Sequence, residues 1–82
     1  MEEQKQEQLI IILRCISSFY IKNQNGSLDR KIPCGSIWLD LGIENHLRKL
    51  KRVDRRMKQP YAYIDKNTIV SNFEIKGEYT ND

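Results

Sequence analysis

The chain has 82 residues and a formal net charge of +3, which is enough for one small domain. A domain of this size has a small core and marginal stability, so a second subunit is an expected source of stability. Residues 44–59 carry seven cationic side chains and two carboxylates, a net charge of +5, against −2 for the rest. This asymmetry favours an anionic partner such as nucleic acid.

Several classes of protein are excluded by what the sequence lacks. It has no Walker loop, no G-x-S-x-G and no G-x-G-x-x-G motif, so we expect neither an enzyme nor a cofactor. Cys15, Cys34 and His46 cannot form a zinc site without carboxylates, and the cysteines are expected to be reduced thiols. The acidic N-terminus and the short apolar run 9–13 predict a soluble, cytoplasmic protein with no membrane partner.

The first predicted element is an amphipathic helix over residues 3–22. Apolar residues recur at helical spacing and would lie on one face: Leu9, Ile12, Leu13, Ile16, Phe19 and Tyr20. The stretch NQNGS then ends the helix. Ile10, Ile11 and Cys15 lie outside this stripe, which predicts a homodimer seam along the first helix.

A short second helix is predicted in the middle of the chain. Pro33 is typical of a helix start and Gly42 of a helix end. Ile37, Trp38 and Leu41 would supply its apolar side. The run SIWLDL also fits a buried strand, because short apolar runs are ambiguous, but the helix is the preferred interpretation.

Residues 44–59 predict a third helix with one apolar and one cationic face. Its apolar residues would be Ile43, Leu47, Leu50, Val53 and Met57. Like-charged pairs four residues apart, such as Lys51 and Arg55, destabilise a helix by about 0.2–0.5 kcal/mol each. A purely structural role does not explain that cost, so the cationic face predicts an anionic ligand. Gln59-Pro60 would end the helix.

After Pro60 the hydrophobic period changes from that of a helix to that of a strand. The runs YAYI and TIVSNFEI, separated by Asp65-Lys66-Asn67, predict a C-terminal β-hairpin. Residues 1–4 and 77–82 are expected to fray. Tyr61 and Tyr63 at the start of the hairpin are candidates for stacking on bases, although packing on the sheet is the more ordinary role.

In element order the chain resembles the winged helix-turn-helix family. The resemblance is carried by IPCGSIWLDLGIENHLRKLKR followed by YAYIDKNTIVSNFEI. It implies an α+β fold, a single domain over residues 1–82, with a three-helix core and a C-terminal β-hairpin wing. It also implies that the third helix enters the DNA major groove while the wing touches the backbone or the minor groove. Small chains of this architecture occur in phages, prophages and mobile elements, including excisionase-like proteins, so regulation of transcription or of another DNA transaction is the expected role.

A set of contacts to double-stranded DNA follows from this arrangement. Residues near the start of the third helix are candidates for reading base edges: Asn45, His46, Arg48, Lys49 and Arg52. Lys51 belongs to the same cationic face. Phosphate contacts are expected from Arg55, Arg56, Lys58 and Lys66. The alternatives are an acidic protein that docks on the basic helix, and RNA.

Overall fold

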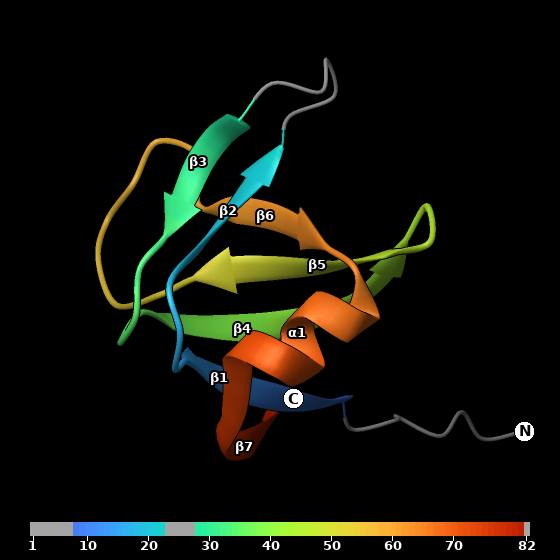
Figure 1. Ribbon diagram of the computed structural model, residues 1–82. Helices are drawn as coiled ribbons and strands as arrows, with labels where there is room; N and C mark the ends of the chain where they lie inside the picture. Colours follow the sequence, from blue (N-terminus) through green and yellow to red (C-terminus); the bar gives the residue numbers. More distant parts are fainter. Residues whose placement is uncertain (1–7, 23–27, 82) are drawn as a thin grey trace, which may run out of the picture.

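A computed structural model describes residues 8–22 and 28–81 of the chain. Over these residues the protein folds as seven β-strands and one short helix (Figure 1). The strands are β1 (Gln8–Cys15), β2 (Phe19–Lys22), β3 (Leu28–Ile32), β4 (Ile37–Glu44), β5 (Leu47–Arg52), β6 (Tyr61–Ile64) and β7 (Phe73–Asn81). The helix is α1 (Lys66–Asn72).

Five strands form one antiparallel sheet in the order β6-β5-β4-β1-β7, and β2 pairs with β3 in a separate hairpin. Strands β4, β5 and β6 follow one another as a meander, whereas β7 returns to pair with β1. The hairpin and α1 both lie in front of the sheet in Figure 1. One face of the sheet therefore packs against these two elements, and we call the opposite face the outer face.

The core lies between the sheet, the β2–β3 hairpin and α1. Its buried apolar residues are Leu13, Cys15, Ile32, Trp38, Leu50, Ala62, Ile64, Ile69 and Phe73. The Trp38 side chain is fully buried, and its Nε1–H donates to Ser36 Oγ at 2.8 Å. The Ser36 hydroxyl in turn donates to the Pro33 carbonyl at 2.6 Å. The indole N–H thus has a partner, which a buried polar group requires.

Arg30 fastens the β2–β3 hairpin to the sheet. Its guanidinium lies 5.5 Å from the ring centroid of Trp38. The same group donates to the Tyr61 carbonyl of β6 at 2.8 Å and lies 3.7 Å from the sulfur of Met57. A planar cation with several donors can stack on an aromatic ring and hydrogen-bond at once, which suits Arg better than Lys.

The predicted first helix is wrong, because its residues 8–15 and 19–22 form β1 and β2. Its residues 3–7 lie outside the described part of the chain. Three consecutive isoleucines favour a strand, since β-branched side chains fit a pleated surface better than a helix. Alternation then sends Ile11 to the core side and Ile10 to the outer face. Cys15 is buried in the core. Ile10, Ile11 and Cys15 therefore share no common surface, and the predicted dimer seam along a helix is overturned.

The predicted middle helix is also wrong, and the strand alternative for SIWLDL is the observed one. Trp38 and Leu39 pair with β1 on one side and with β5 on the other. The pairing of β4 with β5 shifts register between Asp40 and Ile43. Gly42 lies at this irregularity with φ 107°, a conformation that glycine adopts without steric cost.

The predicted basic helix over residues 44–59 is replaced by a turn, a strand and a loop. Asn45 and His46 have φ of 54° and 70°, as in the tight two-residue turns that connect antiparallel strands. The helical spacing of Leu47, Leu50 and Val53 was misleading, because only Leu50 of the three is buried. The three-helix core of a winged helix-turn-helix fold is thus not present among the described residues.

The predicted C-terminal hairpin is correct only in part. The strand expected at YAYI is confirmed as β6, but its partner is β5. Asp65 does not begin a turn between strands; its side chain accepts the Thr68 amide at 3.1 Å and caps α1. Residues 77–81, expected to fray, belong to β7 and pair with β1. Residues 1–4 and 82 lie outside the described residues.

Candidate nucleic-acid interface

The structure divides the candidate DNA contacts among different parts of the fold. Asn45 and His46 form the β4–β5 turn. Four of the cations lie on β5: Arg48, Lys49, Lys51 and Arg52. Three more lie in the β5–β6 loop, residues 53–60: Arg55, Arg56 and Lys58. Six strand residues span about 20 Å, so the turn and the loop lie at opposite ends of β5. A base-reading role inferred from positions along one helix is therefore overturned.

The cations of β5 point to both faces of the sheet. Successive side chains of a strand alternate between its faces. Leu50 is fully buried, so Arg48 and Arg52 lie on the core side while Lys49 and Lys51 lie on the outer face. The two arginines cover the margin of the core with their aliphatic stems, as long charged side chains commonly do.

Arg48 is neutralised by a carboxylate on the neighbouring strand. Its Nε lies 2.8 Å from Asp40 Oδ2. The Asp40 side chain is only 11% exposed, and its other oxygen accepts the Gly42 amide at 3.0 Å. This ion pair is therefore part of the β4–β5 packing.

Arg52 is held inside the molecule by Asp54. The guanidinium donates to both carboxylate oxygens, Nε at 2.7 Å and Nη2 at 3.0 Å, and the Arg52 side chain is 10% exposed. Asp54 Oδ1 also accepts the Ile37 amide at 3.2 Å. The hydrogen bonds from Arg52, with a further contribution from Ile37, hold the pKa of Asp54 below its usual value. Both side chains thus serve to join β4 to the end of β5.

Two lysines of β5 lie next to two tyrosines of β6 on the outer face of the sheet. Lys49 lies opposite Tyr63, and Lys51 lies opposite Tyr61. The Nζ atoms of Lys49 and Lys51 lie 4.6 and 6.0 Å from the ring centroid of Tyr61. Glu44 is 3.8 Å from Lys49, which is a weak contact for two partly exposed groups. Both tyrosines are 41% exposed.

The cations of the β5–β6 loop adjoin this arrangement. Arg55, Arg56 and Lys58 are exposed, and none of them is within ion-pair distance of a carboxylate of residues 8–22 or 28–81. The loop leaves β5 after Arg52 and enters β6 at Tyr61. We call the combined region the β5–β6 surface; it comprises Lys49, Lys51, Arg55, Arg56, Lys58, Tyr61 and Tyr63.

The remaining candidate residue lies away from this surface. Lys66 is the first residue of α1, at the end of β6 opposite the loop. Conversely, Tyr61 and Tyr63 were only secondary candidates in the site predicted from the sequence. Their signal was the alternation of YAYI, in which Ala62 and Ile64 are buried and the two tyrosines are exposed.

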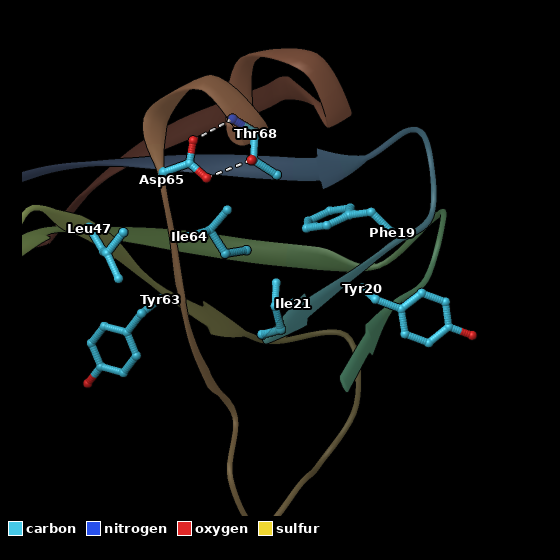
Figure 2. Close-up of a pocket in the computed structure, with 8 residues that line it drawn as sticks. All are labelled: Phe19, Tyr20, Ile21, Leu47, Tyr63, Ile64, Asp65 and Thr68. Atoms are coloured by element: carbon cyan, nitrogen blue, oxygen red, sulfur yellow. Dashed lines mark hydrogen bonds between the residues drawn. The ribbon is translucent and has the colours of Figure 1, made fainter. Parts of the chain in front are cut away.

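A shallow groove of about 190 Å³ runs beside the β5–β6 surface (Figure 2). It is lined by Phe19, Tyr20, Ile21, Leu47, Tyr63, Ile64, Asp65 and Thr68. Both oxygens of Asp65 accept hydrogen bonds from Thr68, one from Oγ1 at 2.6 Å and one from the amide at 3.1 Å. These bonds lower the pKa of Asp65. The single carboxylate of the groove is therefore committed to capping α1, and the lining residues other than Asp65 and Thr68 are aliphatic or aromatic.

Other kinds of site are not evident. Within residues 8–22 and 28–81, no three His, Cys, Asp or Glu side chains are grouped so as to hold a metal ion. The same part of the chain has no helix that is both long and apolar enough for a membrane span. Comparison with protein-family models, with curated proteins and with solved structures found no match.

Proposed function

We propose that the protein binds nucleic acid through the β5–β6 surface. The observation that carries the proposal is the contrast within the basic stretch. Arg48 and Arg52 form short ion pairs with Asp40 and Asp54. The loop cations have no carboxylate partner among the described residues. Three exposed cations within the eight-residue β5–β6 loop repel one another, and a polyanion removes that repulsion.

Phosphate is the anion that fits this surface best. Arg55 and Arg56 carry guanidinium groups that bind phosphate in a bidentate manner, and Lys58 adds a point charge. Neutralising several phosphates releases condensed counterions, which drives binding at low and moderate salt. In this proposal, side chains of the sheet and of the β5–β6 loop contact the nucleic-acid backbone, and no helix enters the major groove. It places the protein among regulators of DNA or RNA transactions in the cytoplasm.

The proposal is tested by the salt dependence of binding. Fluorescence anisotropy with labelled 12-nucleotide single strands and a 12-base-pair duplex would be measured between about 50 and 200 mM salt. Five cations predict slopes of log K against log salt of about −3.5 for a single strand and about −4.5 for a duplex.

A matched pair of variants separates position from net charge. The triple variant Arg55→Ala, Arg56→Ala, Lys58→Ala should reduce the single-strand slope by about 2. The control triple Lys31→Ala, Lys66→Ala, Lys76→Ala removes the same charge from elsewhere and should leave the slope within about 0.5 of the wild type. Absence of binding to every oligonucleotide at low salt, or equal losses in the two triples, would contradict the proposal.

A further inference from the structure

We infer that the ligand of the β5–β6 surface is a single strand, whose bases stack on Tyr61 and Tyr63 while its phosphates lie against the neighbouring cations. This inference rests on the proposed function and specifies its substrate class. It requires that the tyrosines be accessible, suitably spaced and bordered by cations, and that a duplex be unable to use them.

The spacing of the two tyrosines suits bases that are not stacked on each other. Tyr61 and Tyr63 are two residues apart on β6, so they lie on the same face, with Cα atoms about 6.6 Å apart. Successive bases in a duplex strand are about 3.4 Å apart. Two rings at twice that distance match neighbouring bases of an extended strand better than the continuous stack of a duplex.

The lysines and the tyrosines form two neighbouring rows. Lys51 pairs in register with Tyr61 and Lys49 with Tyr63, while both ammonium groups lie near the ring of Tyr61, at 6.0 and 4.6 Å. A single strand likewise presents a row of bases beside a row of phosphates. The loop cations Arg55, Arg56 and Lys58 continue the positive charge beyond Tyr61. Two bases and the adjoining phosphates correspond to a short site of about 4 nucleotides, at the lower end for single-strand-binding proteins.

The lysines near Tyr61 do not prevent stacking. Lys49 Nζ lies 4.6 Å and Lys51 Nζ 6.0 Å from the centroid of this ring. An exposed contact of this kind changes an equilibrium by a factor of about 2 to 5. Stacking of one base on an aromatic side chain contributes a factor of about 5 to 150. A base can therefore displace these ammonium groups, which then become available to phosphates. No cation lies over the ring of Tyr63 among the described residues.

A duplex cannot use the tyrosines in this way. Its base faces are covered by their neighbours in the stack, and only base edges and phosphates are accessible. Contact with a duplex would thus involve only the cations and would leave both rings exposed. Single strands offer unstacked bases, for which aromatic side chains are the usual platform. The tyrosines therefore favour a single strand, and the cations alone do not distinguish the two.

The decisive experiment compares tyrosine variants on three probes: a 12-nucleotide oligo(dT), a 12-nucleotide oligo(U) and a 12-base-pair duplex. The double variant Tyr61→Leu, Tyr63→Leu should weaken binding of at least one single-stranded probe by about 10-fold or more. Duplex binding should change less than 2-fold, and the salt slope should not change. The double variant Tyr61→Phe, Tyr63→Phe keeps the rings and should bind within about 2-fold of the wild type. The oligo(dT) and oligo(U) arms distinguish DNA from RNA.

Two further measurements separate stacking from indirect effects. Tyr20→Leu removes an exposed tyrosine from β2, outside the β5–β6 surface, and should leave affinity unchanged. Tyr63→Trp keeps an aromatic ring, and its fluorescence should be quenched when a single strand binds. Thermal unfolding of each variant would show that the fold is intact.

The outcomes distinguish this inference from the proposed function on which it rests. Equal affinity for single strands and duplex, with no effect of the leucine variants, would overturn stacking and leave nucleic-acid binding in place. If the wild-type protein bound none of the three probes, both the stacking inference and the proposed function would be overturned. Conversion of a wild-type dimer to a monomer by the leucine variants, with oligonucleotide affinity unchanged, would assign the tyrosines to a contact between two copies of the chain and overturn the inference.

Discussion

The guanidinium of Arg52 donates two hydrogen bonds to the carboxylate of Asp54, at 2.7 and 3.0 Å. The same carboxylate accepts the Ile37 amide, and the Arg52 amide donates to the Pro60 carbonyl at 2.8 Å. The loop of residues 53–60 is thereby closed at its base. The position of the loop that carries Arg55, Arg56 and Lys58 thus depends on this ion pair.

The first prediction concerns the contribution of Asp54 to stability. Asp54→Asn should lower the free energy of unfolding at pH 7 by about 1.5 kcal/mol, because hydrogen bonds to charged groups are stronger than neutral ones. The pKa of Asp54 is lower in the folded state than its usual 3.8. The stabilisation is therefore complete above the unfolded pKa and is lost as the pH falls through the folded pKa.

Urea unfolding at pH 7 and at pH 2 would test this prediction. The difference between wild type and Asp54→Asn should shrink at the lower pH, because the carboxyl loses its charge as the pH falls toward and through its lowered folded-state pKa. The control Glu44→Gln breaks a 3.8 Å exposed contact and should cost less than about 0.5 kcal/mol. A difference between wild type and Asp54→Asn that does not change with pH would contradict the ionic explanation.

The β4–β5 turn provides the second prediction. Both Asn45 and His46 have positive φ, and glycine is preferred at the second position of such a turn. His46→Gly should stabilise the protein by about 0.5–1 kcal/mol, because a left-handed conformation costs an ordinary residue about 1–2 kcal/mol, an amount partly offset by the chain entropy of glycine. His46→Val should destabilise it by about 1 kcal/mol or more. Thermal unfolding measures both changes, and the opposite order would contradict the turn geometry.

The buried hydrogen bond between Trp38 and Ser36 provides the third prediction. Ser36→Ala removes the acceptor of the indole N–H, and an unsatisfied buried donor costs about 1–3 kcal/mol. The free energy of unfolding should fall by that amount in urea titrations followed by tryptophan fluorescence. Ser71→Ala, at an exposed position of α1, is the matched control and should stay within about 0.5 kcal/mol of wild type. Equal effects at the two serines would show that the indole does not depend on Ser36.

The fourth prediction concerns the two free cysteines. Cys15 is 1% exposed, and burial raises the pKa of its thiol, whereas Cys34 is exposed. The thiolate is the reactive form, so iodoacetamide at pH 8 should modify Cys34 first. Mass spectrometry should show one modified cysteine in the native protein and two in urea. Rapid modification of Cys15 under native conditions would contradict its place in the core.

The strand at YAYI was predictable because its alternation is local. Ala62 and Ile64 face the core and the two tyrosines do not, as a period of two requires. The residues of α1 were wrongly predicted to form a strand, because Ile69 and Val70 favour that structure. The Asp65 cap and the burial of Ile69 against the sheet form the helix instead.

The three predicted helices were wrong because pairing between strands, which the sequence does not show, decides the structure there. Leu9, Ile12 and Leu13 of β1 also fit a helical stripe, and pairing with β4 and β7 on either side selects the strand. Likewise, the basic stretch is evident in the sequence, but the predicted single cationic face is wrong, because the faces and partners of its side chains depend on strand register and turn geometry. Asp40 reaches Arg48 across the β4–β5 pair, eight residues away in sequence. No periodicity argument assigns such a pair, so the sequence alone could not separate neutralised cations from free ones.

The last prediction contrasts Arg52 with Arg55 and Arg56, all of which the sequence placed on the cationic face of one helix. Arg52→Ala should lower the free energy of unfolding by about 1.5–3 kcal/mol, because it leaves the partly buried Asp54 without its charged partner. Its effect on the salt dependence of nucleic-acid binding should be small. The double variant Arg55→Ala, Arg56→Ala should have the opposite profile: stability within about 0.5 kcal/mol of wild type, and a single-strand slope reduced by about 1.4. Urea unfolding and anisotropy on the same preparations measure both quantities. If Arg52→Ala instead reduced the slope and left stability unchanged, Arg52 would contact the ligand directly, and the assignment of binding to the loop would be wrong.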